Sequence, residues 1–81
     1  MQVRVRFFSY LGGLIGAQQV ELSLPEAATV AGLSQRLQEM YPERAVLLAQ
    51  AVFIADRKST TPETALTDGA QILVLLSLGG G

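Results

Sequence analysis

The sequence contains no cysteine, no histidine and no tryptophan. The lack of cysteine excludes disulfides and thiolate nucleophiles, and the lack of histidine removes the commonest general base in enzymes. Together the two absences exclude the usual structural zinc sites, iron–sulfur clusters and haem held by His or Cys. A self-contained enzyme is therefore disfavoured, and a small carrier, a binding module or a subunit is favoured.

Charged residues are also scarce. They make up 16% of the chain, and six basic residues against seven acidic ones give a net charge of −1. The few aromatic residues do not alternate with basic ones, so nucleic-acid binding is not expected. Apolar runs such as residues 72–76 are far shorter than the roughly 20 residues of a membrane helix, and charges interrupt the apolar start of the chain. We expect a cytoplasmic protein without a membrane anchor.

The chain is one domain of 81 residues, of which 49% are hydrophobic. A chain of this length buries only about 60–65% of the surface that its unfolded form exposes, so the core is thin. The first segments read as strands. Residues 2–8 and 18–24 both alternate between apolar and polar side chains, which predicts a β-hairpin with a wide or broken helical turn at 9–17.

A helix is predicted to begin after Thr29, whose hydroxyl can cap the first turn, and to end before Pro42. Gly32 inside this helix costs about 1 kcal/mol relative to alanine, and we expect close approach of the helix to the sheet to compensate for it. The apolar stripe of the helix has spacings of three and four residues. It consists of Val30, Leu33, Leu37 and Met40.

The second half of the chain contains shorter patterns. They are, in chain order, an ambiguous segment at 43–50 with room for a helical turn, a strand at 52–54, a polar turn at 56–59, a connection at 60–65 with room for a brief edge strand, and a turn at 66–69. Residues 71–76 are nearly all apolar, as in a central strand covered on both faces. The order is two strands, a helix, and two or three strands, and the first and last strands are expected to be central neighbours.

Packing does not explain the last three residues, Gly79, Gly80 and Gly81. A glycine tail is slender, so its terminal carboxylate can enter a narrow channel of another protein. This carboxylate has an ordinary pKa of about 3.3–3.7 and is ionised near neutrality, where it can attack the α-phosphate of ATP. The chain has no phosphate-binding loop, so a partner must bind the ATP. The alternative is a frayed chain end without a function.

The sequence resembles the small subunit of molybdopterin synthase along its whole length. The resemblance rests on Val5-Arg6-Phe7-Phe8 with the Leu/Gly-containing segment after it, on Leu66-Thr67-Asp68-Gly69 before an apolar strand, and on the terminal Gly80-Gly81. It implies an α+β fold of the β-grasp, or ubiquitin-like, type, with a mixed sheet of four to five strands packed on one main helix. Residues 1–78 would form this domain, and 79–81 would form a flexible tail.

The resemblance also implies a mechanism. An E1-like adenylyltransferase would adenylate Gly81, a sulfur donor such as a cysteine desulfurase would supply sulfur, and the resulting thiocarboxylate would act inside the large subunit of molybdopterin synthase. Gly79 and Gly80 would serve as the slender tail. The chain itself would bind no cofactor and no metal, because ATP is used by the E1-like partner.

Three departures from the family pattern leave other pathways open. Leu75-Leu76-Ser77-Leu78 replaces a Phe-Pro-Pro-type stretch, the last turn reads Asp68-Gly69-Ala70 instead of Asp-Gly-Asp, and the tail has three glycines instead of two. Sulfur carriers for thiamine, cysteine or tRNA thiolation share the fold and the tail. A ubiquitin-like modifier or binding module is a further alternative.

Other residues have two interpretations each. A sheet covered by one helix leaves its second face open, so Leu73, Leu75 and Leu78, with Phe8, are predicted to dock on a partner. The alternative is that Phe8 and the 43–50 segment cover this face. Arg4 and Arg6 are interpreted as solvated strand residues rather than as contacts to an acidic partner, and Lys58 as a solubilising residue rather than an acceptor for conjugation.

Overall fold

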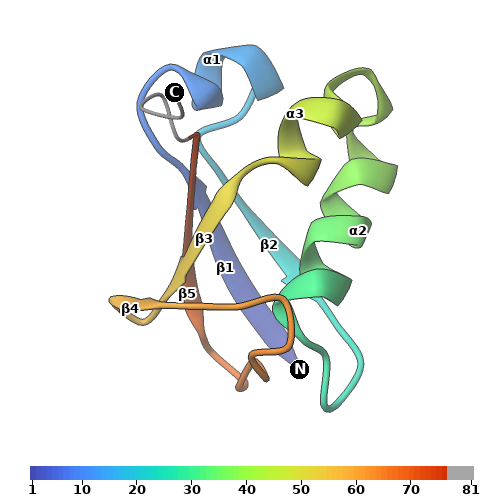
Figure 1. The fold of residues 1–81 in the computed structure, drawn as a ribbon, viewed down its shortest axis with the longest axis vertical. Helices are drawn as coiled ribbons and strands as arrows, with labels where there is room; N and C mark the ends of the chain where they lie inside the picture. The colour runs from blue at the N-terminus through green and yellow to red at the C-terminus, as the bar shows by residue number, and fades with distance from the viewer. Residues whose placement is uncertain (77–81) are drawn as a thin grey trace.

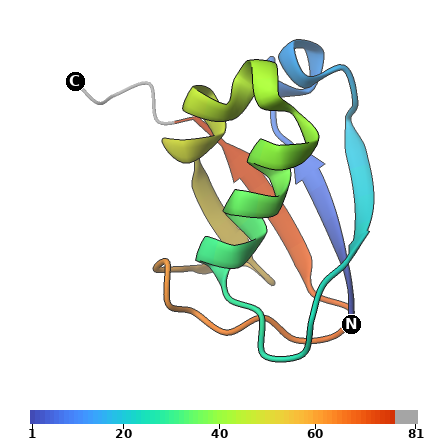
Figure 2. The ribbon, with the colours of Figure 1, turned by 90° about the vertical axis from the view of Figure 1, so that its right-hand side faces the viewer.

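A helix crosses one face of a five-stranded sheet, and no helix within residues 1–76 covers the opposite face (Figures 1 and 2). The structure is a computed structural model, and it describes residues 1–76. The elements in chain order are β1 (Gln2–Phe7), α1 (Leu11–Ile15), β2 (Gln19–Ser23), α2 (Val30–Met40), the 3₁₀ helix η1 (Pro42–Arg44), α3 (Ala45–Ala49), β3 (Val52–Ala55), β4 (Lys58–Ser59) and β5 (Gln71–Leu75).

The strand order in the sheet is β2-β1-β5-β3-β4. Strands β1 and β2 form the predicted antiparallel hairpin, with α1 as the helical turn between them. Strand β5 pairs in parallel with β1 and antiparallel with β3. The prediction that the first and last strands are central neighbours is therefore confirmed, and the long segment between them contains α2, as a parallel connection requires.

The alternation of β1 places every second side chain in the core. Val3, Val5 and Phe7 are almost fully buried, and Ile72 and Val74 of β5 lie beside them. On the helix, Val30, Leu33 and Leu37 complete this core. The predicted stripe is wrong at its last position, because Met40 is 37% exposed. At about 100° per residue, Leu37 lies about 20° from Val30 around the helix axis and Met40 about 80° from it, at the edge of the stripe.

Thr29 caps helix α2 as predicted, because its hydroxyl accepts a hydrogen bond from the backbone N–H of Gly32 at 3.3 Å. The expectation of close approach at Gly32 is wrong. Gly32 is exposed, and a Cβ atom built there would meet only the Thr29 Oγ1 atom, at 3.8 Å. That distance is an ordinary van der Waals contact, and nothing in the structure explains the glycine.

We therefore expect Gly32→Ala to stabilise the protein by about 0.5–1 kcal/mol, because alanine restricts the unfolded chain and favours the helix. The matched control is Gly69→Ala. Gly69 has φ +81°, so a side chain there is strained, and the control should lose about 1 kcal/mol. Urea unfolding of both variants measures these changes. A loss of stability in Gly32→Ala would contradict the open position of this residue.

The second half of the chain differs from the sequence predictions in detail. The ambiguous 43–50 segment forms η1 and α3. The edge strand lies at Lys58–Ser59 rather than within 60–65, where Ala65 only forms an isolated bridge to Thr29. The reason is the turn at Asp56 and Arg57, which both have positive φ and thereby place Lys58 directly opposite Ala55.

Strand β5 is covered on one face only, in contrast to the prediction of cover on both faces. Ile72 and Val74 are buried against the helix side, whereas Leu73 and Leu75 are half-buried on the other side. Helix α3 does not cover them. It packs beside α2, on the same side of the sheet, and its Leu48 belongs to the same core (Figure 2).

Candidate carrier site and docking face

Strand β5 holds the start of the C-terminal tail in a fixed place. Its neighbours β1 and β3 pair with it on both edges, and the N–H of Phe8 donates to the carbonyl of Val74 at 2.8 Å. Leu76, the next residue after β5, still packs against the core. The predicted site residues Gly79, Gly80 and Gly81, together with Leu78, lie outside the described residues. Their roles, and the predicted boundary between 78 and 79, remain predictions.

The open face of the sheet carries a group of apolar side chains, which we name the apolar patch. Its members come from the end of β1, from β5 and from β3, and they are Phe8, Leu73, Leu75, Val52 and Ile54. Phe8 is 55% exposed and Val52 40% exposed, and the other three are half-buried. Contiguous apolar patches of more than a few hundred Å² are rare on monomers and usually mark a site for a partner or ligand.

The strand register creates this patch. Leu73 lies opposite Ile54, and Leu75 lies opposite Val52. Phe7 pairs with Val74, so the parallel ladder places Phe8 next to Leu75. Val52 and Ile54 were missed by the sequence analysis. The buried Phe53 between them was the available signal, because its neighbours along a strand must point to the other face.

Arginines lie beside the apolar patch. Arg4 and Arg6 are on the same face of β1, and together with Arg57 they line a shallow hollow of about 790 Å³ whose apolar wall includes Leu73 and Ile54. Arg4 forms an ion pair with Glu21 at 2.9 Å, and both side chains are about half exposed. Such a surface pair contributes roughly 0–1 kcal/mol to stability.

The carboxylates near the sheet stabilise turns. Asp56 Oδ1 accepts a hydrogen bond from the backbone N–H of Gln71 at 3.0 Å, and Asp68 Oδ1 accepts one from the N–H of Gln2 at 2.7 Å. Within residues 1–76, no three His, Cys, Asp or Glu residues gather closely enough to hold a metal ion. The same part of the chain contains no helix that is long and apolar enough to cross a bilayer.

The elements and their order have close counterparts among solved structures. The protein from Pyrococcus furiosus described as molybdopterin converting factor subunit 1 superposes with a TM-score of 0.86 at 20% identity, over 96% of this chain and 99% of that one. Small archaeal modifier protein 1 from Haloferax volcanii superposes with a TM-score of 0.83 at 13% identity, over 95% and 98%. The fold is the β-grasp.

A third β-grasp counterpart comes from Helicobacter pylori. It was solved as a complex of subunits 1 and 2 of the molybdopterin-converting factor, and it superposes with a TM-score of 0.68 at 22% identity over all of both chains. No protein-family model matches the sequence, and no curated protein sequence matches it significantly. The predicted β-grasp architecture, a mixed five-stranded sheet packed on one main helix, is thus confirmed at the level of fold.

Proposed function

We propose that this β-grasp protein is a sulfur carrier. In this proposal the carboxylate of Gly81 is activated as an acyl adenylate, converted to a thiocarboxylate and used as the sulfur donor in molybdopterin biosynthesis. The observation that carries the proposal is the position of the three glycines, two residues after Leu76, which follows the central strand β5 and packs against the core. The five residues after Leu76 can reach at most about 18 Å.

The proposed chemistry needs no catalytic group from this chain. An oxygen of the Gly81 carboxylate attacks the α-phosphorus of ATP, the bond to the β-phosphate breaks, and pyrophosphate leaves. A hydrosulfide ion then attacks the carbonyl carbon, the bond to AMP breaks, and the thiocarboxylate forms with release of AMP and a proton. With a persulfide as nucleophile, the product is an acyl disulfide, and a thiol must reduce it by two electrons to give the thiocarboxylate.

The partners follow from this chemistry. The E1-like adenylyltransferase binds ATP, a cysteine desulfurase or a similar enzyme provides the sulfur, and the large subunit of molybdopterin synthase receives it. The complex of subunits 1 and 2 in Helicobacter pylori supports a large-subunit partner for this chain. We propose that the partners contact the apolar patch, because a patch beside the root of the tail orients the carboxylate as it enters the channel.

Intact-mass analysis tests the carrier function. Incubation of the protein with an E1-like adenylyltransferase from the same organism, ATP and a sulfide donor should raise its mass by about 16 Da, the difference between sulfur and oxygen. The same mixture without ATP is the control and should leave the mass unchanged. If a panel of active E1-like enzymes gives neither an adenylate nor this mass increase, the carrier function is wrong.

A second candidate function is protein modification. Its support is the β-grasp similarity to small archaeal modifier protein 1. In this function an amine of another protein, instead of sulfide, opens the adenylate and forms an amide with Gly81. Mass spectrometry of cell extracts distinguishes the two functions, since lysine-linked tail adducts favour modification and a thiocarboxylate favours sulfur transfer. A pull-down identifies the partner that co-purifies with the protein. The identity of this partner shows which sulfur pathway the protein serves.

A further inference from the structure

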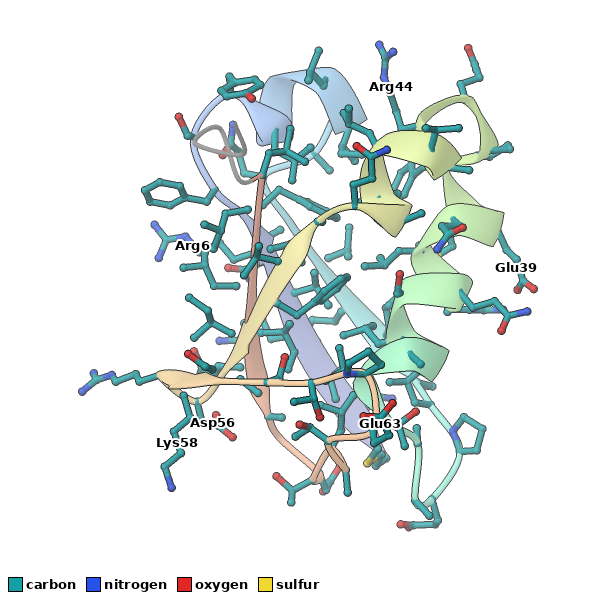
Figure 3. All side chains as sticks on the ribbon, in the orientation of Figure 1. Arg6, Glu39, Arg44, Asp56, Lys58 and Glu63 are labelled. Atoms are coloured by element: carbon teal, nitrogen blue, oxygen red, sulfur yellow. The ribbon has the colours of Figure 1, made fainter. Side chains whose placement is uncertain are left out.

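The charges on the open face of the sheet are predominantly positive, although the chain as a whole has a net charge of −1. Three arginines, Arg4, Arg6 and Arg57, line the hollow on this face. Figure 3 shows Arg6 projecting from the sheet on the side away from helix α2, whereas Glu39 projects from the helix on the opposite side of the molecule. The lining of the hollow thus contains three arginines and one carboxylate, that of Asp56.

Two of these arginines are outside any ion pair in the described part of the chain, although the Asp56 carboxylate lines the same hollow. Glu21 is engaged with Arg4, and the carboxylate of Asp56 accepts a hydrogen bond from the backbone of Gln71. No ion pair forms at Arg6 or Arg57 among residues 1–76. The interpretation of Arg6 as a solvated strand residue does not take account of its neighbour in the fold. Its register partner is Leu73 of the apolar patch, and Leu73 in turn lies opposite Ile54.

The arrangement has a direction along β5. The arginines border the patch near Leu73, whereas Phe8 and Leu75 lie at the end from which the tail continues. Leu73 precedes Leu76 by three residues, which is about 10 Å of strand. A complementary surface would therefore have an apolar centre, a channel for the tail at one end, and carboxylates about 10 Å from the channel entrance.

We infer that the open face docks on an acidic-rimmed apolar surface of the adenylating partner, whose carboxylates contact Arg6 and Arg57. This inference rests on the proposed carrier function. Complementary charges at the border of an interface accelerate association and reject wrong partners. A second copy of this chain fits less well, because a two-fold interface through this face would bring like-charged arginines together.

Calorimetric titration of the E1-like adenylyltransferase with the full-length protein, without ATP, tests the inference. Arg6→Glu should weaken binding by about 10-fold or more, because it places two like charges together at the interface. Arg36→Glu on the exposed side of α2 makes the same charge change on the other face and should bind within about 2-fold of the parent protein. Raising the NaCl concentration from about 0.05 M to about 0.5 M should weaken binding of the parent protein to the enzyme but should not weaken binding of Arg6→Glu.

The double variant Arg6→Gln and Arg57→Gln removes both positive charges without introducing negative ones. Circular dichroism confirms that each variant is folded. Equal binding of Arg6→Glu and Arg36→Glu would overturn the inference, as would a parent protein that does not bind the enzyme at all. A parent protein that binds through Arg6 but never forms an adenylate would leave the docking surface intact and refute the carrier function. Arg6-dependent dimers of the protein, measured by sedimentation, would assign the face to a second copy and overturn the inference.

Discussion

Deletion of Gly81 is expected to reduce adenylate formation at least about 100-fold, although the shortened chain still ends in two glycines. The physical reason is reach. Leu76 is the last described residue and is held against the core. Removing one residue after it moves the carboxylate back by about 3.5 Å from the α-phosphate in the partner. A displacement of about 1 Å can already cost about 100-fold in rate. Pyrophosphate release under saturating ATP measures the effect.

A matched variant separates length from residue type. Gly81→Ala keeps the full length of the tail and adds one Cβ atom, which widens the chain and restricts its backbone. We expect it to be impaired through the fit of the channel, and more active than the deletion. Both variants should unfold at the same urea concentration as the parent protein. If the deletion variant is adenylated at the full rate, the partner recognises any diglycine end and does not measure the distance from the sheet.

Leu37→Ala is expected to reduce the free energy of unfolding by about 2–5 kcal/mol. Leu37 is fully buried between helix α2 and the sheet, so its removal loses apolar contacts and leaves a cavity. A domain of 81 residues has a total stability of only about 4–12 kcal/mol, so this single change removes a large part of it. Urea unfolding monitored by circular dichroism gives the value.

The control for this prediction is Met40→Ala in the last turn of the same helix. Met40 is 37% exposed, so the same kind of truncation should cost less than about 1 kcal/mol. The two variants distinguish between two arrangements of the helix. In the stripe predicted from residue spacing, both Leu37 and Met40 belong to the core, whereas in the structure only Leu37 does. Equal losses in the two variants would show that Met40 is packed as tightly as Leu37.

The tail and the docking face depend on the same strand. Strand β5 contributes Ile72 and Val74 to the core and Leu73 and Leu75 to the open face, and its end carries the tail. In the proposed function, a partner that contacts the open face would therefore also receive the carboxylate in a defined direction. This arrangement supports the proposed carrier function, in which the chain would present one reactive carboxylate to its partner in a reproducible position.

Much of the fold could be predicted from local patterns. The alternation of β1 and β2, the capping of α2 by Thr29 and the turn within 66–69 are all confirmed. Each of them depends on residues a few positions apart, where periodicity and backbone sterics act directly. The glycine tail, on which the proposed function rests, is likewise a property of the sequence alone.

The tertiary structure decided what depends on segments far apart in the chain. The register of β3 against β5 brought Val52 and Ile54 into the apolar patch, and the parallel pairing of β1 with β5 placed Arg6 beside Leu73. Register was not readable from the sequence, because a shift by one residue moves every side chain of a strand to the other face. The sequence by itself determined the main helix and the four longer strands, and that three glycines follow them. Only packing decided which side chains surround the root of that tail.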